Sequence, residues 1–295
     1  MTTTTPTRSV GTDDPADHDR VLPEPDWELD RLDLDAYLAR IGHHGPRTPT
    51  RDTLDAVYCA HQRSVPFENV TALTGDHVPL DLDALQAKMV DRRRGGYCFE
   101  HVLLFGAALT RLGFDVTRLA ARVRPNAPQP LPRTHQLLLT RVDDEPMVCD
   151  IGFGAGVLAP LPLADGVTRQ GDWEYRVQRH DDGWLLSERG AGDWSDLHLF
   201  TEQPQLPSDV EMANHFTATS SHSPFSHRLL AMHVDERARH TLVDRTLTVE
   251  RPDGAHHERQ LSTDEALTAL AGTFNVHLDD AEQAAVRAHL ETVRT

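Results

Sequence analysis

The stretch Arg92-Arg93-Arg94-Gly95-Gly96-Tyr97-Cys98-Phe99-Glu100-His101 separates two segments of helical periodicity and decides how the first part of the chain folds. Ahead of it, apolar residues recur at helical spacing at Leu82, Leu85 and Met89. Gly95 and Gly96 predict the end of that helix and a tight turn, because glycine leaves the backbone free. A second apolar face follows at Phe99, Val102, Leu103, Gly106 and Leu109. Cys98 is therefore expected in the first turn of a new helix.

A cysteine in that position has two interpretations. The N-terminus of a helix carries unpaired amide donors and about half a positive charge, which favours a thiolate over a thiol. A cysteine near a helix start is also commonly a small, buried, apolar residue. Partner residues elsewhere in the chain are needed to favour a reactive nucleophile over a packed side chain.

Two candidate partners follow in the chain. His135 opens the apolar run Gln136-Leu137-Leu138-Leu139-Thr140, and Asp150 closes the run Met147-Val148-Cys149, so both runs are predicted strands. A nucleophilic cysteine needs a base that takes its proton and a carboxylate that orients that base. Cys98, His135 and Asp150 supply these three groups in that order.

Four segments of the chain resemble the arylamine N-acetyltransferase family: Val65-Pro66-Phe67-Glu68-Asn69, Arg94-Gly95-Gly96-Tyr97-Cys98-Phe99-Glu100-His101, Thr134-His135 with its apolar run, and Asp150-Ile151-Gly152-Phe153-Gly154. They stand in the order and at the spacings of that family, with 37 residues from the cysteine to the histidine and 15 from the histidine to the aspartate. The similarity runs from about Leu32 through at least Phe225, where Ser223-Pro224-Phe225 resembles the segment that enters the family's last domain.

The resemblance implies that Cys98 is the acyl-accepting nucleophile, His135 its base and Asp150 the orienting carboxylate. It also implies an α+β fold, in which an N-terminal helical domain, a central antiparallel β-barrel and a C-terminal α/β lid surround a papain-like Cys-His-Asp core. One position departs from the pattern. The family usually has asparagine two residues after the motif glutamate, where this chain has Val102.

The periodicity along the chain indicates the same order of parts, although it does not fix their topology. Residues 1–25 are rich in Thr, Asp and Pro and are predicted to be a disordered extension. Residues 26–114 form a predicted helical domain that carries the nucleophile, residues 115–210 a β-barrel domain that carries the histidine and the aspartate, and residues 211–295 an α/β lid domain. The proline-rich loop 125–132 leads directly to His135.

Several elements are predicted by local signals. One hairpin is expected over 173–186, turning at Asp181-Asp182-Gly183, and another over 246–261, turning at Pro252-Asp253-Gly254. Thr50 is expected to cap a helix, and Ser262 with Glu265 forms a capping box ahead of a further helix. A last helix is expected over 282–293.

The reaction that the resemblance implies is ping-pong acyl transfer from acetyl-CoA, or another acyl-CoA, through a cysteine thioester to the amine of an arylamine or arylhydrazine. The expected substrate-binding residues are Phe67, Thr134, Phe153 and Phe225. Two alternatives stay open. An amide synthase of the same family would release or cyclise a carrier-bound polyketide with the same cysteine chemistry. A cysteine hydrolase would use the same three residue types with water as the acceptor.

Composition narrows the partners and the compartment. The chain of 295 residues has 46 acidic and 29 basic residues, a net charge of -17 that disfavours nucleic acid and anionic membranes as partners. Three cysteines are too few for a disulfide framework, and no signal peptide or membrane-spanning run stands out. Cys98 and His101 supply only two ligands on one helix face, so no metal is expected. A cytoplasmic enzyme is predicted, and whether it forms a homo-oligomer is left open.

Overall fold

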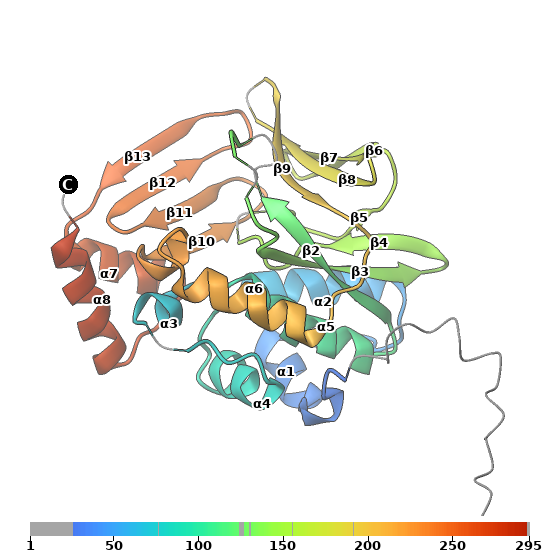
Figure 1. Ribbon diagram of the computed structural model, residues 1–295, viewed down its shortest axis with the longest axis horizontal. Helices are drawn as coiled ribbons and strands as arrows, with labels where there is room; N and C mark the ends of the chain where they lie inside the picture. The colour runs from blue at the N-terminus through green and yellow to red at the C-terminus, as the bar shows by residue number, and fades with distance from the viewer. Residues whose placement is uncertain are drawn as a thin grey trace, which may run out of the picture.

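The computed structural model describes residues 26–293, apart from residues 76, 124–126, 130, 155 and 191. The predicted extension 1–25 therefore lies outside the described residues. Helices gather along one side of the molecule and two antiparallel sheets lie on the other (Figure 1). The architecture matches the predicted α+β fold. No helix in the described part of the chain has the length and apolar character that crossing a membrane requires.

The first two helices have local caps, and the one at Thr50 was predicted from the sequence. Helix α1 (Leu34–Ile41) ends at Gly42, whose φ of 71° is left-handed. Helix α2 (Arg51–Ser64) begins after Thr50, whose side chain accepts a hydrogen bond from the amide of Thr53. Both termini are thus stabilised locally, by a hydroxyl N-cap and a glycine C-cap.

The helix and turn that precede Cys98 depart from their prediction in one respect. Helix α4 (Leu82–Leu85) continues as a π-helical segment (Gln86–Asp91), and the left-handed residue after it is Arg93, with φ 54°. Gly95 is needed for a different reason from backbone handedness. A Cβ on Gly95 would lie 2.0 Å from the carbonyl oxygen of Pro66, so only glycine permits the two chain segments to approach.

Buried ion pairs fix the turn between α4 and helix α5 (Cys98–Arg111). Arg94 donates to Glu68 at 2.8 Å and also pairs with Glu282. Lys88, the sole lysine of the sequence, donates to Glu100 at 2.7 Å. Because an unpaired buried charge is costly, these pairs hold the turn in one arrangement. Lys88 and Arg94 therefore act as buried ion-pair partners, whereas Arg92 and Arg93 are exposed.

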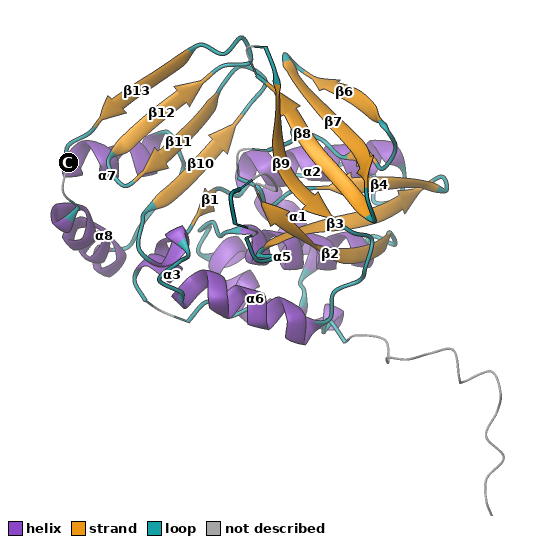
Figure 2. Ribbon diagram, turned by 45° about the horizontal axis from the view of Figure 1, so that its top comes forward, coloured by secondary structure: helices purple, strands orange, loops and turns teal. Residues whose placement is uncertain are grey.

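An eight-stranded antiparallel sheet curls into the nearly closed barrel (Figure 2). Its strand order is β5-β4-β3-β2-β9-β8-β7-β6. The strands are β2 (Asp115–Val123), β3 (His135–Val142), β4 (Glu145–Cys149), β5 (Leu161–Pro162), β6 (Gly166–Gln170), β7 (Trp173–His180), β8 (Gly183–Arg189) and β9 (Trp194–Phe200). The predicted hairpin over 173–186 is the β7–β8 pair. Helix α5 packs against β2 and β3, which places the start of α5 beside the barrel.

A five-stranded sheet in the order β1-β10-β11-β12-β13 forms the other sheet. Its strands are β1 (Phe67–Glu68), β10 (Leu230–Val234), β11 (Arg239–Val243), β12 (Thr246–Glu250) and β13 (His256–Gln260). The β12–β13 pair confirms the predicted second hairpin. Strand β1 comes from far earlier in the chain than the other four strands. The last sheet therefore includes a segment that precedes α5 in the sequence.

The remaining helices cover these sheets. They are α3 (Val70–Leu73), α6 (Pro207–Thr219), α7 (Thr263–Gly272) and α8 (Asp280–Thr292), with short 3-10 turns at Leu29–Arg31 and Pro224–Ser226. The Ser262 capping box at the start of α7 and the last helix are as predicted. One hydrophobic core joins the helices to the barrel, and a second lies between the five-stranded sheet and helices α7 and α8.

Candidate active site

Cys98 is the first residue of α5, as the sequence predicts. The carboxylate of Glu100 accepts a hydrogen bond from the backbone amide of Tyr97 at 3.1 Å and so closes the helix N-terminus. Cys98 is buried, and its thiol lies 3.6 Å from the carbonyl oxygen of Thr134. The predicted nucleophile thus meets the residue directly before the predicted base.

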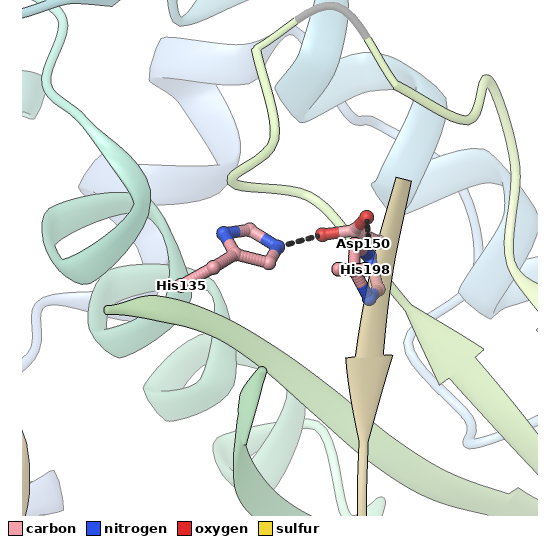
Figure 3. A group of neighbouring side chains, drawn as sticks. All are labelled: His135, Asp150 and His198. Carbon is pink, nitrogen blue, oxygen red and sulfur yellow. Dashed lines mark hydrogen bonds and ion pairs between the residues drawn. The ribbon is translucent and has the colours of Figure 1, made fainter. Parts of the chain in front are cut away.

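Antiparallel pairing of β3 and β4 brings His135 and Asp150 together. Leu138 pairs with Cys149, so the start of β3 and the end of β4 lie at the same edge. His135 Nε2 donates to Asp150 Oδ1 at 2.7 Å, as Figure 3 shows. The same imidazole lies close enough to Cys98 for the cysteine to raise its pKa. Cys98, His135 and Asp150 thus form one group of interacting side chains.

The electrostatic interactions in this group favour a protonated His135 beside an ionised Asp150. Burial alone disfavours an imidazolium, but the Asp150 carboxylate and Cys98 outweigh it and raise the pKa of His135 to about 10. Burial also disfavours the carboxylate, yet His135 and His198 hold the pKa of Asp150 well below its usual range. At neutral pH the arrangement therefore stabilises a protonated His135 between the carboxylate and the cysteine.

His198 is a member of the site that the sequence did not reveal. It lies on β9, fully buried, and its Nε2 donates to Asp150 Oδ2 at 2.8 Å (Figure 3). Its Nδ1 has no hydrogen-bond partner among the described residues. Burial lowers the pKa of His198, although Asp150 opposes that shift. His198 lies two residues before Phe200, so both side chains lie on the same face of a short strand. No strand was predicted there, and this signal was therefore missed.

The atoms of His135, Asp150 and His198 that face one another lie within 4.8 Å, close enough to consider a metal ion. The two oxygens of the carboxylate each accept a hydrogen bond from one imidazole, at 2.7 and 2.8 Å. These contacts have the lengths of charge-assisted hydrogen bonds, so both oxygens of the carboxylate already have a partner.

The loop after Asp150 closes over the cysteine. A Cβ on Gly152 would lie 2.7 Å from the Cα of Cys98, so a side chain at that position has no room. Phe153 follows and packs edge-on against His135, with ring centroids 5.1 Å apart. It also lies 5.5 Å from the ring of His198. Phe153 thus forms an aromatic surface beside the imidazole rings of His135 and His198.

The other predicted substrate residues lie in a second group. Phe67 and Phe225 meet edge-on, with ring centroids 6.3 Å apart, and Phe225 also contacts Tyr97. Phe67 is buried, whereas Phe225 is partly exposed. Thr134 offers its carbonyl to Cys98. The proline-rich loop 125–132 that leads to His135 lies partly outside the described residues.

Two positions on the helices are packed residues. Val102, the departure from the family pattern, is fully buried in the core of α5. His61 donates or accepts hydrogen bonds at 2.8 Å with both Tyr37 and His101. His101 in turn contacts the carbonyl oxygen of Gly96, in the turn before Cys98. The histidine on α2 is therefore part of a buried hydrogen-bond chain, as expected for a packed residue.

The chain is similar to known proteins over most of its length. A family model described as N-acetyltransferase matches residues 50–283. The arylamine N-acetyltransferase of Mycolicibacterium smegmatis is 39% identical over 271 residues, covering 89% of this chain and 98% of that protein. The arylamine N-acetyltransferase of Escherichia coli is 35% identical over 254 residues, covering 84% and 90%.

Solved structures agree with the sequence comparison. The structure of the arylamine N-acetyltransferase from Mycobacterium abscessus has a TM-score of 0.87 at 38% identity, and the match covers 92% of this chain and 100% of that one. The structure of the Mycobacterium marinum enzyme in complex with CoA has a TM-score of 0.83 at 34% identity, covering 88% of this chain and 99% of that one.

Proposed function

The chain belongs to the arylamine N-acetyltransferase family, and from that premise we propose that it transfers an acetyl group from acetyl-CoA, through a thioester on Cys98, to an arylamine or arylhydrazine. It is an acyltransferase by its family. The observation that carries the cysteine mechanism is the hydrogen bond from His135 to Asp150 beside Cys98, which interacts with the same imidazole.

The first half-reaction loads Cys98. Its thiolate attacks the thioester carbonyl, and the tetrahedral intermediate expels the thiolate of CoA, which takes the proton of the His135 imidazolium. One thioester is exchanged for another, so the step changes free energy little. Backbone amides at the start of α5 are candidates to stabilise the oxyanion, a role that often contributes several kcal/mol.

The second half-reaction releases the product. The amine attacks the thioester on Cys98, neutral His135 takes the proton of the amine, and the thiolate leaves as the amide forms. An aromatic amine is unprotonated at neutral pH and can attack, whereas an alkylamine is almost wholly protonated. Phe153, packed against His135, supplies an aromatic surface for a flat substrate.

His198 acts in this scheme as a positioning residue. By binding Asp150 Oδ2, it leaves Oδ1 directed at His135 and prevents the carboxylate from rotating. A carboxylate fixed at both oxygens holds the imidazole in one orientation. His198 does not contact the reacting atoms.

Steady-state kinetics with acetyl-CoA and a panel of arylamines test the proposal. Transfer predicts parallel lines in double-reciprocal plots, one amide formed for each CoA released, and CoA release that depends on the amine. CoA release at one rate with or without amine, and without amide, would support a hydrolase. Rapid alkylation of Cys98 in a protein that does not accept acyl-CoA would support the carrier-linked amide synthase.

A further inference from the structure

A buried arginine on β2 has no acidic partner. Arg118 is 5% exposed, and its Nε is a buried donor without an acceptor among the described residues. No ion pair or hydrogen bond to its guanidinium occurs in the described part of the chain. Burial lowers the pKa of Arg118 to about 10, and no neighbouring carboxylate offsets that shift. A buried, uncompensated charge is costly, so this position is unusual.

The surroundings accommodate the guanidinium without neutralising it. Trp27 lies against it, with the guanidinium carbon 4.1 Å from the ring centroid. Gly106 on α5 leaves it space, because a Cβ there would be 3.3 Å from Nη2. A cation–π contact compensates only part of the cost of removing an ion from water. The charge therefore lacks the counter-ion that its burial calls for.

Arg118 lines a cavity of about 350 Å³. The apolar part of the wall comes from Trp27, Val78, Pro79, Leu80, Leu82, Leu103 and Val210. Asn214 is also in the wall, and its amide donates to the carbonyl of Val78 at 3.0 Å while its oxygen accepts from the hydroxyl of Tyr97. None of the residues Cys98, His135, Asp150 and Phe153 lines this cavity.

The positive charge at the cavity is buried, and the negative charges around it are exposed. The guanidinium of Arg118 is buried, whereas four carboxylate residues of the lining are exposed to solvent: Asp26, Glu28, Asp81 and Glu211. One buried cation can pair with one anionic group. An exposed acidic rim repels ligands with further negative charge and tolerates a neutral or cationic far end.

We propose that this cavity binds a small monocarboxylate with a flat apolar body and a neutral or cationic far end. The carboxylate pairs with the guanidinium of Arg118, a geometry that permits two parallel hydrogen bonds. The apolar body packs on Trp27 and Leu103, and the far end lies among the rim carboxylates. A ligand there would border Asn214, and through it Tyr97, the residue before Cys98.

Isothermal titration calorimetry with 3-phenylpropionate tests the site on the full chain. We expect a saturable heat that persists after Cys98 has been alkylated, since the two sites share no residue. Arg118→Met should weaken binding at least tenfold. The matched control is Arg141→Met, which removes the same charge from an exposed position on β3 and should leave the affinity unchanged. The neutral analogue 3-phenylpropanamide should not bind, and the dianion of phenylphosphonate should bind more weakly.

Equal affinity in Arg118→Met, or no heat from the parent protein at millimolar ligand, would overturn the proposal and leave Arg118 a structural residue. Loss of the heat on alkylating Cys98 would place the carboxylate in the acetyl-transfer site and would equally overturn it. If circular dichroism shows that Arg118→Met does not fold, Trp27→Ala takes its place. An affinity that this second variant leaves unchanged would also contradict the proposal.

Discussion

Asp150 and His198 meet across the barrel, where His198 Nε2 donates to the carboxylate oxygen that His135 does not use, at 2.8 Å. The residues come from the end of β4 and from β9, strands that are separated in the sheet by β3 and β2. The carboxylate is thus held between two imidazoles whose ring centroids lie 5.0 Å apart. Its orientation depends on the closure of the sheet as well as on the loop after β4.

Replacing His198 tests that dependence. His198→Phe removes a hydrogen bond to a charged group, worth about 1.5–3 kcal/mol, so we expect acylation to slow by roughly 10- to 100-fold. His198→Gln keeps a donor and should recover part of the loss. Single-turnover acylation by acetyl-CoA across pH measures both variants. If the phenylalanine and glutamine variants lose activity equally and keep the pH profile of the parent, His198 is a packing residue.

Acetyl-CoA alone should label one cysteine. Peptide mass mapping after incubation is expected to find a single acetyl group on Cys98 and none on the other two cysteines. Burial raises the pKa of both Cys59 and Cys149, which keeps them as unreactive thiols. Cys98→Ala should remove the label and leave the fold intact by circular dichroism. An adduct that maps to Cys59 or Cys149 would contradict the assignment of the nucleophile.

Asp150→Asn should change how alkylation depends on pH. In the parent protein the pKa of His135 is raised to about 10, so its imidazolium persists from neutral pH to about pH 9 and iodoacetamide should react with Cys98 throughout. Without the carboxylate charge, burial dominates and the pKa of His135 falls below its usual value, so the imidazole is already largely neutral at pH 7. We expect acylation to fall by up to about 10⁴-fold, as for a comparable aspartate in a protease triad. Overlapping rate profiles of variant and parent would make Asp150 a structural residue.

Gln136→Met should stabilise the protein. The amide of Gln136 is 1% exposed, and neither its Nε2 nor its Oε1 has a partner among the described residues. An unsatisfied buried amide costs about 1–3 kcal/mol, whereas methionine has a similar length and no such need. Calorimetry should show a higher Tm, by roughly 2–4 °C for each kcal/mol. Gln178→Met, at an exposed position on β7, is the control and should change little. A lower Tm for Gln136→Met would indicate that a buried water satisfies the amide.

The candidate site was largely predictable because its parts are contiguous motifs. Cys98 begins a helix and His135 begins a strand, so each position followed from local periodicity. Asp150 follows the next strand, and antiparallel pairing of consecutive strands brings the two residues to one edge. That the three act as a triad remains a proposal, which the experiments above address.

Other features depend on contacts between distant segments. Strand β1 has only two residues and pairs with β10, so no local pattern marks it. His198 acquires its meaning from Asp150, 48 residues earlier. Gly95 is required by the carbonyl of Pro66, not by a left-handed turn, and sequence periodicity carries no information about that approach. These are cases in which tertiary structure decides the local role.

The two-residue strand β1 has a consequence for how the molecule opens. The amide of Glu68 donates to the carbonyl of Gly96 at 2.9 Å, and Glu68 is also paired with Ala231 on β10. The turn before Cys98 and the C-terminal sheet thus share one short segment of backbone. Amide hydrogens of Gly96 and of β10 should therefore exchange with solvent as one cooperative unit, with a common opening free energy. A local opening of the turn before Cys98 must therefore also break the pairing of β1 with β10, a strand that lies more than a hundred residues later in the chain.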